Sequence, residues 1–146
     1  MPKNYDRNDF AWSYRGGYIL SHDGDFSDTK YDPLRSQYEE IRDVVKSDIN
    51  SWKIAKNIGA SLSDFVGEPN NKITAEAIKT RIISALTRNG LVNSEDLKVT
   101  YLPYDIDKLI IRISIKVAPT AANKGSNTLS ITMGYSYSEN NVFVLN

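Results

Sequence analysis

The chain has 146 residues, enough for one domain whose hydrophobic core needs no metal or disulfide. Apolar residues make up 40% and charged residues 25%, a globular composition that excludes a disordered chain. The 18 basic residues balance the 18 acidic ones, so no overall charge draws the protein to nucleic acid, and little self-repulsion opposes association.

The absence of cysteine excludes disulfides, thiolate nucleophiles and the common structural zinc sites. The N-terminal residues lack the apolar segment of a secretory signal, and no apolar run reaches the about 20 residues of a membrane helix. We therefore expect a soluble protein made in the cytoplasm, with no cofactor, no membrane and no nucleic acid as partner.

Residues 1–16 form a polar segment with four aromatic residues that follow neither a helical nor a strand period. This pattern predicts an extended N-terminal arm, whose rings either anchor a partner or cover part of the chain's own core. Residues 17–146 are predicted to form a single domain. It begins with a short strand at 17–21 and a turn at 22–25, where Asp23 precedes Gly24.

A helix is predicted over residues 33–50, because Asp32 and Pro33 suit an N-cap and a first helical position. Apolar residues then recur at steps of three and four and form one stripe. The stripe consists of Leu34, Tyr38, Ile41, Val45 and Ile49. Burying each large side chain contributes about 1.5–3 kcal/mol, so the stripe must pack against the chain's own core or a partner helix.

Two further helices are predicted in the middle of the chain. After an extended stretch at 52–54 and a turn at 57–59, Ser61 starts a short helix that stops at Gly67. Thr74 is the expected cap of the next helix, which ends before Gly90. Its apolar stripe is Ala75, Ile78, Ile82, Ala85 and Leu86.

The last third of the chain changes to a period of two. Apolar and polar residues alternate in three segments, 97–101, 111–117 and 129–137. This alternation predicts antiparallel strands with one solvated face, and residues 142–145 are a candidate final edge strand. A hairpin at 104–108 and a polar loop at 118–127 connect them. The predicted fold class is α+β, with helices packed on one face of a mostly antiparallel sheet and a C-terminal β-meander.

Metal-binding residues are sparse in this sequence. His22 is the only histidine and lies in an Asp-rich turn, where a solvated side chain is expected. Asp23 and Asp25 superficially suggest a calcium loop, but an EF-hand needs Gly at position 6 and Glu at position 12. Those positions hold Asp28 and Leu34. We therefore predict no metal site.

Catalytic residues are also not apparent. A glycosidase needs two carboxylates that face each other across a cleft, and the candidates are Glu39, Glu40, Asp64 and Glu68. Glu39 and Glu40 are adjacent on the predicted helix and point about 100° apart. No phosphate-binding glycine loop and no nucleophile elbow occurs either. The sequence therefore predicts that the protein is not an enzyme.

Several segments, in this order, resemble one known family. They are Gly24-Asp25-Phe26, then Pro33-Leu34-Arg35-Ser36-Gln37, then Asn57-Ile58-Gly59-Ala60-Ser61-Leu62-Ser63-Asp64-Phe65-Val66-Gly67, and finally Ile82-Ile83-Ser84-Ala85-Leu86. The third is similar to a polar-x-Gly-small-x-Leu segment of the gene-product-twenty-five-like baseplate wedge, or sheath-initiator, family of contractile phage tails. That family is related to type VI secretion baseplate proteins. The resemblance covers residues 17–117.

One family motif is missing. Many members carry Glu-Pro-Arg after the first helix, whereas this chain has Ser47-Asp48-Ile49-Asn50-Ser51-Trp52-Lys53 there. Its Glu68-Pro69 pair comes later and is followed by Asn70. Contacts that depend on the motif in relatives are therefore not expected to carry over.

The resemblance implies a structural role in the virion, in the baseplate of a contractile tail. The first helix would bind other wedge proteins, and the edge of the C-terminal sheet would accept strands of the sheath protein by β-augmentation. The tail tube or hub is a further candidate partner. The candidate interface residues are Leu34, Tyr38, Ile41, Val45, Ile49, Ile131, Met133, Tyr135, Val142 and Val144. The alternatives are another small tail or adaptor protein and, third, a lysozyme-like glycan hydrolase.

Overall fold

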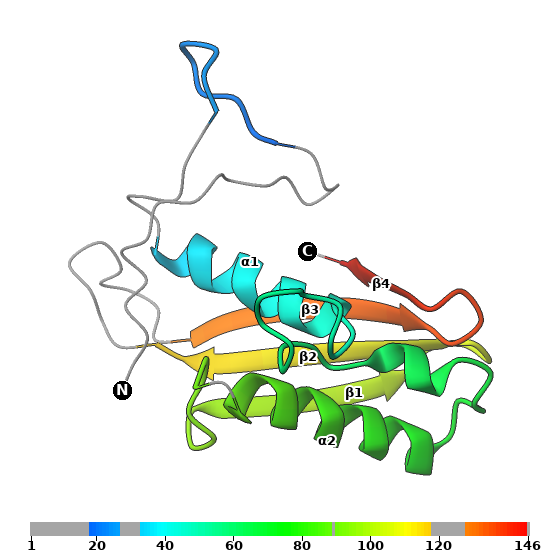
Figure 1. Cartoon of the computed structure of the whole chain (residues 1–146). Helices are drawn as coiled ribbons and strands as arrows, with labels where there is room; N and C mark the ends of the chain where they lie inside the picture. The colour runs from blue at the N-terminus through cyan, green and yellow to red at the C-terminus, as the bar shows by residue number, and fades with distance from the viewer. Residues whose placement is uncertain (1–17, 27–32, 89, 118–127, 146) are drawn as a thin grey trace.

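The structure is a computed structural model that describes residues 18–26, 33–88, 90–117 and 128–145 (Figure 1). The predicted arm at 1–16, the Asp32 cap and the loop at 118–127 lie outside these residues. No described helix combines the length and apolar character that crossing a membrane requires.

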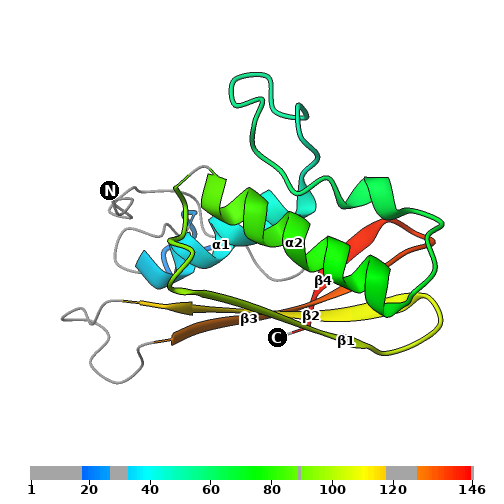
Figure 2. The same ribbon diagram turned by 90° about the horizontal axis from the view of Figure 1, so that it is seen from below.

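The described residues form three helical segments and four strands. In chain order they are α1 (Pro33–Lys46), the 3₁₀ helix η1 (Leu62–Phe65), α2 (Lys72–Arg88), β1 (Leu97–Pro103), β2 (Lys108–Lys116), β3 (Thr128–Ser136) and β4 (Asn141–Val144). The strands pair antiparallel in the order β1-β2-β3-β4, a meander. Both α-helices lie on one face of this sheet (Figure 2). The predicted α+β class and C-terminal meander are confirmed.

The core lies between the helices and the sheet. Its helical part includes Ile41 and Val45 of α1 and Ile78 and Ile82 of α2, none of which has exposed surface. Its sheet part comes from alternate positions of the strands: Val99, Leu109, Ile111, Ile113, Ile115, Ile131, Met133 and Tyr135. The period of two thus buries one face of the sheet, which we call the inner face.

Helix α1 ends at Lys46, so the prediction of a helix to residue 50 is wrong for its last four residues. The segment that resembles the family's Gly-small-x-Leu motif provides the reason. The Ala60 N–H donates to the carbonyl oxygens of Val44 (3.1 Å) and Ser47 (3.0 Å), carbonyl groups that a helix end leaves unsatisfied. Asn50 adopts a left-handed conformation (φ 70°) that a continuing helix does not allow.

Gly59 permits this capping contact. Its φ is +135°, and a Cβ added there would lie 2.6 Å from the carbonyl carbon of Asp48. Only glycine lets the two backbones approach this closely. The Ser61 hydroxyl completes the contact by accepting the N–H of Ile49 (2.7 Å). The motif that carried the family resemblance therefore closes the C-terminal end of α1.

Three local predictions need correction. Ser61 does not cap η1, because it is left-handed (φ 51°) and its side chain makes no cap bond. Asn71, not Thr74, caps α2: the Asn71 side-chain oxygen accepts the N–H of Thr74 (2.9 Å), and the helix starts at Lys72. Residues 52–54 bend and do not extend.

The N-terminal segment 18–26 contains no full strand; its described pairing is a bridge between Leu20 and Phe26. The predicted turn at 22–25 is present. The Ser21 N–H donates to the Asp25 carbonyl (2.7 Å), and Gly24 has a φ of +86°. We call residues 18–26 the N-terminal hairpin.

Candidate functional site

Six of the ten candidate interface residues lie in the chain's own core. Ile41, Val45, Ile131, Met133 and Tyr135 have no exposed surface, and Val142 is 7% exposed. A partner cannot contact these side chains unless the fold opens. Of the two explanations that the sequence left open for the helical stripe, packing on the chain's own core therefore applies to Ile41 and Val45.

The other four candidates keep part of their surface. Leu34 and Tyr38 on α1, Ile49 beyond its end, and Val144 on β4 are half-buried. These four residues are spread over α1, the segment after it and β4. They do not form a binding surface by themselves, so a partner would have to contact other residues as well.

Strand β4 is the last strand of the sheet, and its outward backbone groups can be assigned from the register. The Leu145 N–H donates to the Thr132 carbonyl (2.9 Å), which continues the pairing of Met133 with Val144. Because hydrogen-bonded and non-bonded pairs alternate in an antiparallel ladder, Asn141 and Phe143 bond to β3. The N–H and C=O groups of Val142 and Val144 therefore point away from the sheet.

Strand β1 forms the opposite edge. The Lys116 N–H donates to the Asp96 carbonyl and the Tyr104 N–H to the Lys108 carbonyl, both at 3.0 Å. By the same alternation, Pro103 is an outward position of β1, where its missing N–H removes a donor from the edge. Tyr101 donates its hydroxyl proton to Glu76 of α2 (2.8 Å), which holds that helix against β1. Val142 and Val144 of β4 thus keep both outward groups, whereas β1 lacks one outward donor, at Pro103.

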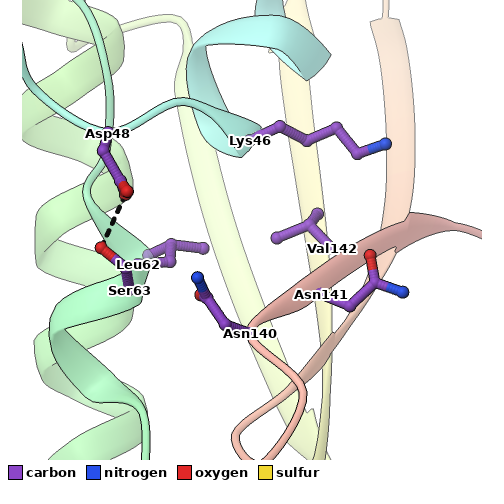
Figure 3. A pocket seen from close by; sticks show the side chains of 7 residues that line it. All are labelled: Lys46, Asp48, Leu62, Ser63, Asn140, Asn141 and Val142. Carbon is purple, nitrogen blue, oxygen red and sulfur yellow. Dashed lines mark hydrogen bonds between the residues drawn. The ribbon is translucent and has the colours of Figure 1, made fainter. Parts of the chain in front are cut away.

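A small polar pocket of about 120 Å³ lies beside the start of β4 (Figure 3). Lys46 and Asp48 reach it from the end of α1, Ser63 from η1, and Asn140 and Asn141 from the β3–β4 turn. Within it the Ser63 hydroxyl donates to the Asp48 carboxylate (2.8 Å). Ligand sites typically measure about 300–1,000 Å³, so this pocket suits one side chain rather than a cofactor or a sugar.

Tyr135 and Asp107 have shifted pKa values, and each forms hydrogen bonds that connect separate parts of the fold. Burial raises the pKa of Tyr135 to about 12, and its hydroxyl donates to the Leu62 carbonyl of η1 (2.7 Å). Hydrogen bonds from Ser138 and Ser136 lower the pKa of Asp107, which links the β1–β2 and β3–β4 turns. Neither Tyr135 nor Asp107 lines either of the two pockets described for this structure.

The candidate carboxylates do not converge on a described pocket. Glu39 is buried and paired with Arg35 (3.2 Å), and Asp64 is paired with Arg81 (2.9 Å). Neither Glu40 nor Glu68 lines the polar pocket beside β4 or the more open pocket near Lys98. Among the described side chains, no three His, Asp or Glu residues gather in a way that could hold a metal ion.

Sequence reasoning missed two exposed features. In the loop between α1 and η1, Trp52 is half-exposed and Ile54 fully exposed, and Figure 2 shows this loop standing away from the body. The second feature is the face of the sheet opposite the helices, which we call the outer face. All its charged strand positions are basic: Lys98, Lys108, Arg112 and Lys116. The pairing of the strands places all four residues on the same face of the sheet. The sequence alone shows this only once the strand register is known.

Comparisons of the chain with family models, with curated proteins and with solved structures find no match. The functional argument therefore depends on the chain's own sequence and geometry.

Proposed function

We propose that the chain is a structural subunit that joins neighbouring proteins in a larger assembly, as a baseplate wedge or sheath-initiator subunit of a contractile tail. The observation that carries the proposal is the edge of β4. Its outward groups on Val142 and Val144 offer a partner strand two N–H donors and two C=O acceptors. The order of sequence segments resembles that of the baseplate family, and this resemblance is the reason for proposing a contractile tail as the assembly.

The surroundings of β4 favour a specific partner strand over arbitrary pairing. The polar pocket of Lys46, Asn140 and Asn141 lies where such a strand would pass the start of β4. In β-augmentation, main-chain bonds supply affinity, and pockets for side chains supply specificity. A sheath-protein strand with a polar side chain at that position fits both features.

The first helix takes a different role from the one that the sequence suggested. Because Ile41 and Val45 are core residues, α1 cannot present them to a wedge neighbour. The exposed loop with Trp52 and Ile54, next to the end of α1, offers a better anchor for that neighbour. Exposed Trp side chains are enriched among residues that dominate binding.

The test is whether the chain needs the β4 edge to capture the sheath protein of a contractile tail. Val144→Pro removes one outward N–H from the edge, and Val144→Ala removes side-chain bulk at the same position but keeps the donor. We expect Val144→Pro to abolish capture of the sheath protein and Val144→Ala to retain most of it. Thermal melting of both variants checks that each remains folded.

Two results would count against the proposal. Purified tail particles without this chain would exclude a baseplate role. Equal capture of the sheath protein by folded Val144→Pro and by the unaltered chain would exclude strand addition at β4. Capture of a tail protein other than the sheath would point to the adaptor alternative.

A further inference from the structure

The outer face of the sheet combines a row of apolar residues with four basic strand residues. Leu102, Ile110, Gly134 and Phe143 are successive partners across the four strands. A Cβ added at Gly134 would lie 2.4 Å from the Phe143 ring, so that ring lies over the glycine. Leu102 is 61% exposed, and Tyr104 beyond it is 70% exposed.

The basic residues surround this row. Arg112 and Lys98 lie on the next two rows of the same face, and Lys108 and Lys116 lie at the two ends of β2. In the described chain none of the four forms an ion pair, although Lys108 helps to lower the pKa of nearby Asp107. The strands carry no acidic residue at an outer-face position, although Glu95 and Asp96, just before β1, line a pocket together with Lys98 and Lys116. The chain as a whole has zero net charge, so this local group of basic residues favours a binding partner that is acidic and partly apolar.

The N-terminal hairpin has that chemistry. Leu20 is 60% exposed, and Tyr18 and Phe26 are 53% and 50% exposed with their rings in edge contact at 5.2 Å. Asp23 and Asp25 lie at its tip, and no Lys or Arg occurs between Tyr18 and Phe26. The pKa of Asp23 is lowered mainly by its hydrogen bond from Ser21, so its charge persists at neutral pH.

In Figure 2 the hairpin lies at the level of α1, on the helix side of the sheet, and in Figure 1 it stands off the body beyond α1. A second copy can bring its hairpin to the outer face without passing around the sheet. We propose that the hairpin 18–26 of one copy docks on the outer face of the next, with Leu20 against the apolar row and Asp23 and Asp25 against Arg112 and Lys98.

This contact is heterologous, because each copy offers a hairpin and a face that differ from each other. Such contacts generate rings when the rotation closes and filaments when it does not. A nine-residue hairpin buries less than the about 1,200 Å² of a standard interface, so a single contact is weak and becomes stable through repetition. The inference does not depend on which partner β4 binds.

The test is charge reversal on both sides, measured by sedimentation of the purified full chain over a wide concentration range. The changes K98E with R112E, and separately D23K with D25K, should each lower the self-association constant about tenfold or more, because they place like charges together. Combining all four changes should restore association. The control K53E with K56E lowers the net charge by the same amount as K98E with R112E, but at residues outside the proposed contact. It should leave association unchanged.

An apolar pair tests the other half of the contact. Leu20→Ser should weaken association, whereas Ile73→Ser, at an 82% exposed residue of α2, should not. A chain that stays monomeric at the highest concentrations would overturn the proposal. So would a four-fold variant that fails to recover association although it is folded, or a hairpin contact that is independent of concentration and hence within one chain. None of these changes touches β4, so strand capture there is a separate readout.

Discussion

The two faces of the sheet come from the same strands but differ in almost every property. On β2, Ile111, Ile113 and Ile115 point into the core and are buried, while Arg112 and Ser114 between them face outward. Inner-face side chains are fixed by packing with α1 and α2. Most outer-face side chains are exposed or half-buried, although Arg112 bonds to Ser130 and Ser136 bonds to Asp107. The comparison separates residues that maintain the fold from residues that can serve partners.

The largest expected effect comes from the inner face. Ile113→Ala should lower the free energy of unfolding by about 2–5 kcal/mol, because it leaves a cavity beneath both helices. Ser114→Ala, one residue away on the outer face, should change it by about 0.5 kcal/mol or less. Urea unfolding measures both. Similar losses for the two variants would mean that the outer face is also covered in the folded chain.

The next effect concerns how α1 is held above the inner face. Gly59→Ala should cost about 3 kcal/mol, since it combines an unfavourable φ with a backbone clash against Asp48. Gly67→Ala is the matched control: its φ is +82°, but nothing lies within 4 Å of the added Cβ. It should cost only about 1 kcal/mol. Equal costs would show that the close approach at Gly59 is not present.

A smaller effect is expected where η1 meets the sheet. Tyr135→Phe removes the hydrogen bond to the Leu62 carbonyl but keeps the ring in the core. We expect a loss of about 1–2 kcal/mol, the usual cost of leaving a buried acceptor without its donor. Hydrogen exchange should localise the change to η1 and β3. An unaltered unfolding midpoint would mean that water replaces the tyrosine hydroxyl.

The smallest effect depends on pH. The pKa of Tyr135 is raised from 10 to about 12 in the folded chain, chiefly by burial, so folding favours its protonated form. The stability that Tyr135 contributes is therefore complete below pH 10 and is lost as pH rises from 10 toward 12. The stability difference between the unaltered chain and Tyr135→Phe should shrink over this range. A difference that stays constant would show that the hydroxyl is not buried.

The sequence predicted the parts of the fold that depend on local pattern. The period of two at 111–117 and 129–137 located β2 and β3, and the stripe through Ile78 and Ile82 located α2. The end of α1 was missed, because Ile49 continues the helical spacing while the capping segment around Gly59 lies ten residues away. Asn71 and Thr74 both suit a helix cap, so spacing alone did not distinguish them.

The candidate site was harder to predict for a physical reason. An apolar stripe has the same spacing whether it packs on a partner helix or on the chain's own sheet, so Ile41 and Val45 fitted both possibilities. The basic outer face requires the strand register, which pairs Lys98 with Ser114 and Thr100 with Arg112 across two strands. The edge role of Val142 and Val144 was predicted from position, and their backbone direction follows only from the pairing of Thr132 with Leu145.

The most direct test of the structural role is a cryo-electron microscopy map of a contractile tail that contains this chain. We predict that a strand of the sheath protein pairs with β4 through the outward groups of Val142 and Val144, while Ile41 and Val45 remain in the core of the subunit. A map in which the edge of β4 faces solvent, or in which a neighbouring protein packs directly on Ile41 and Val45, would contradict the account.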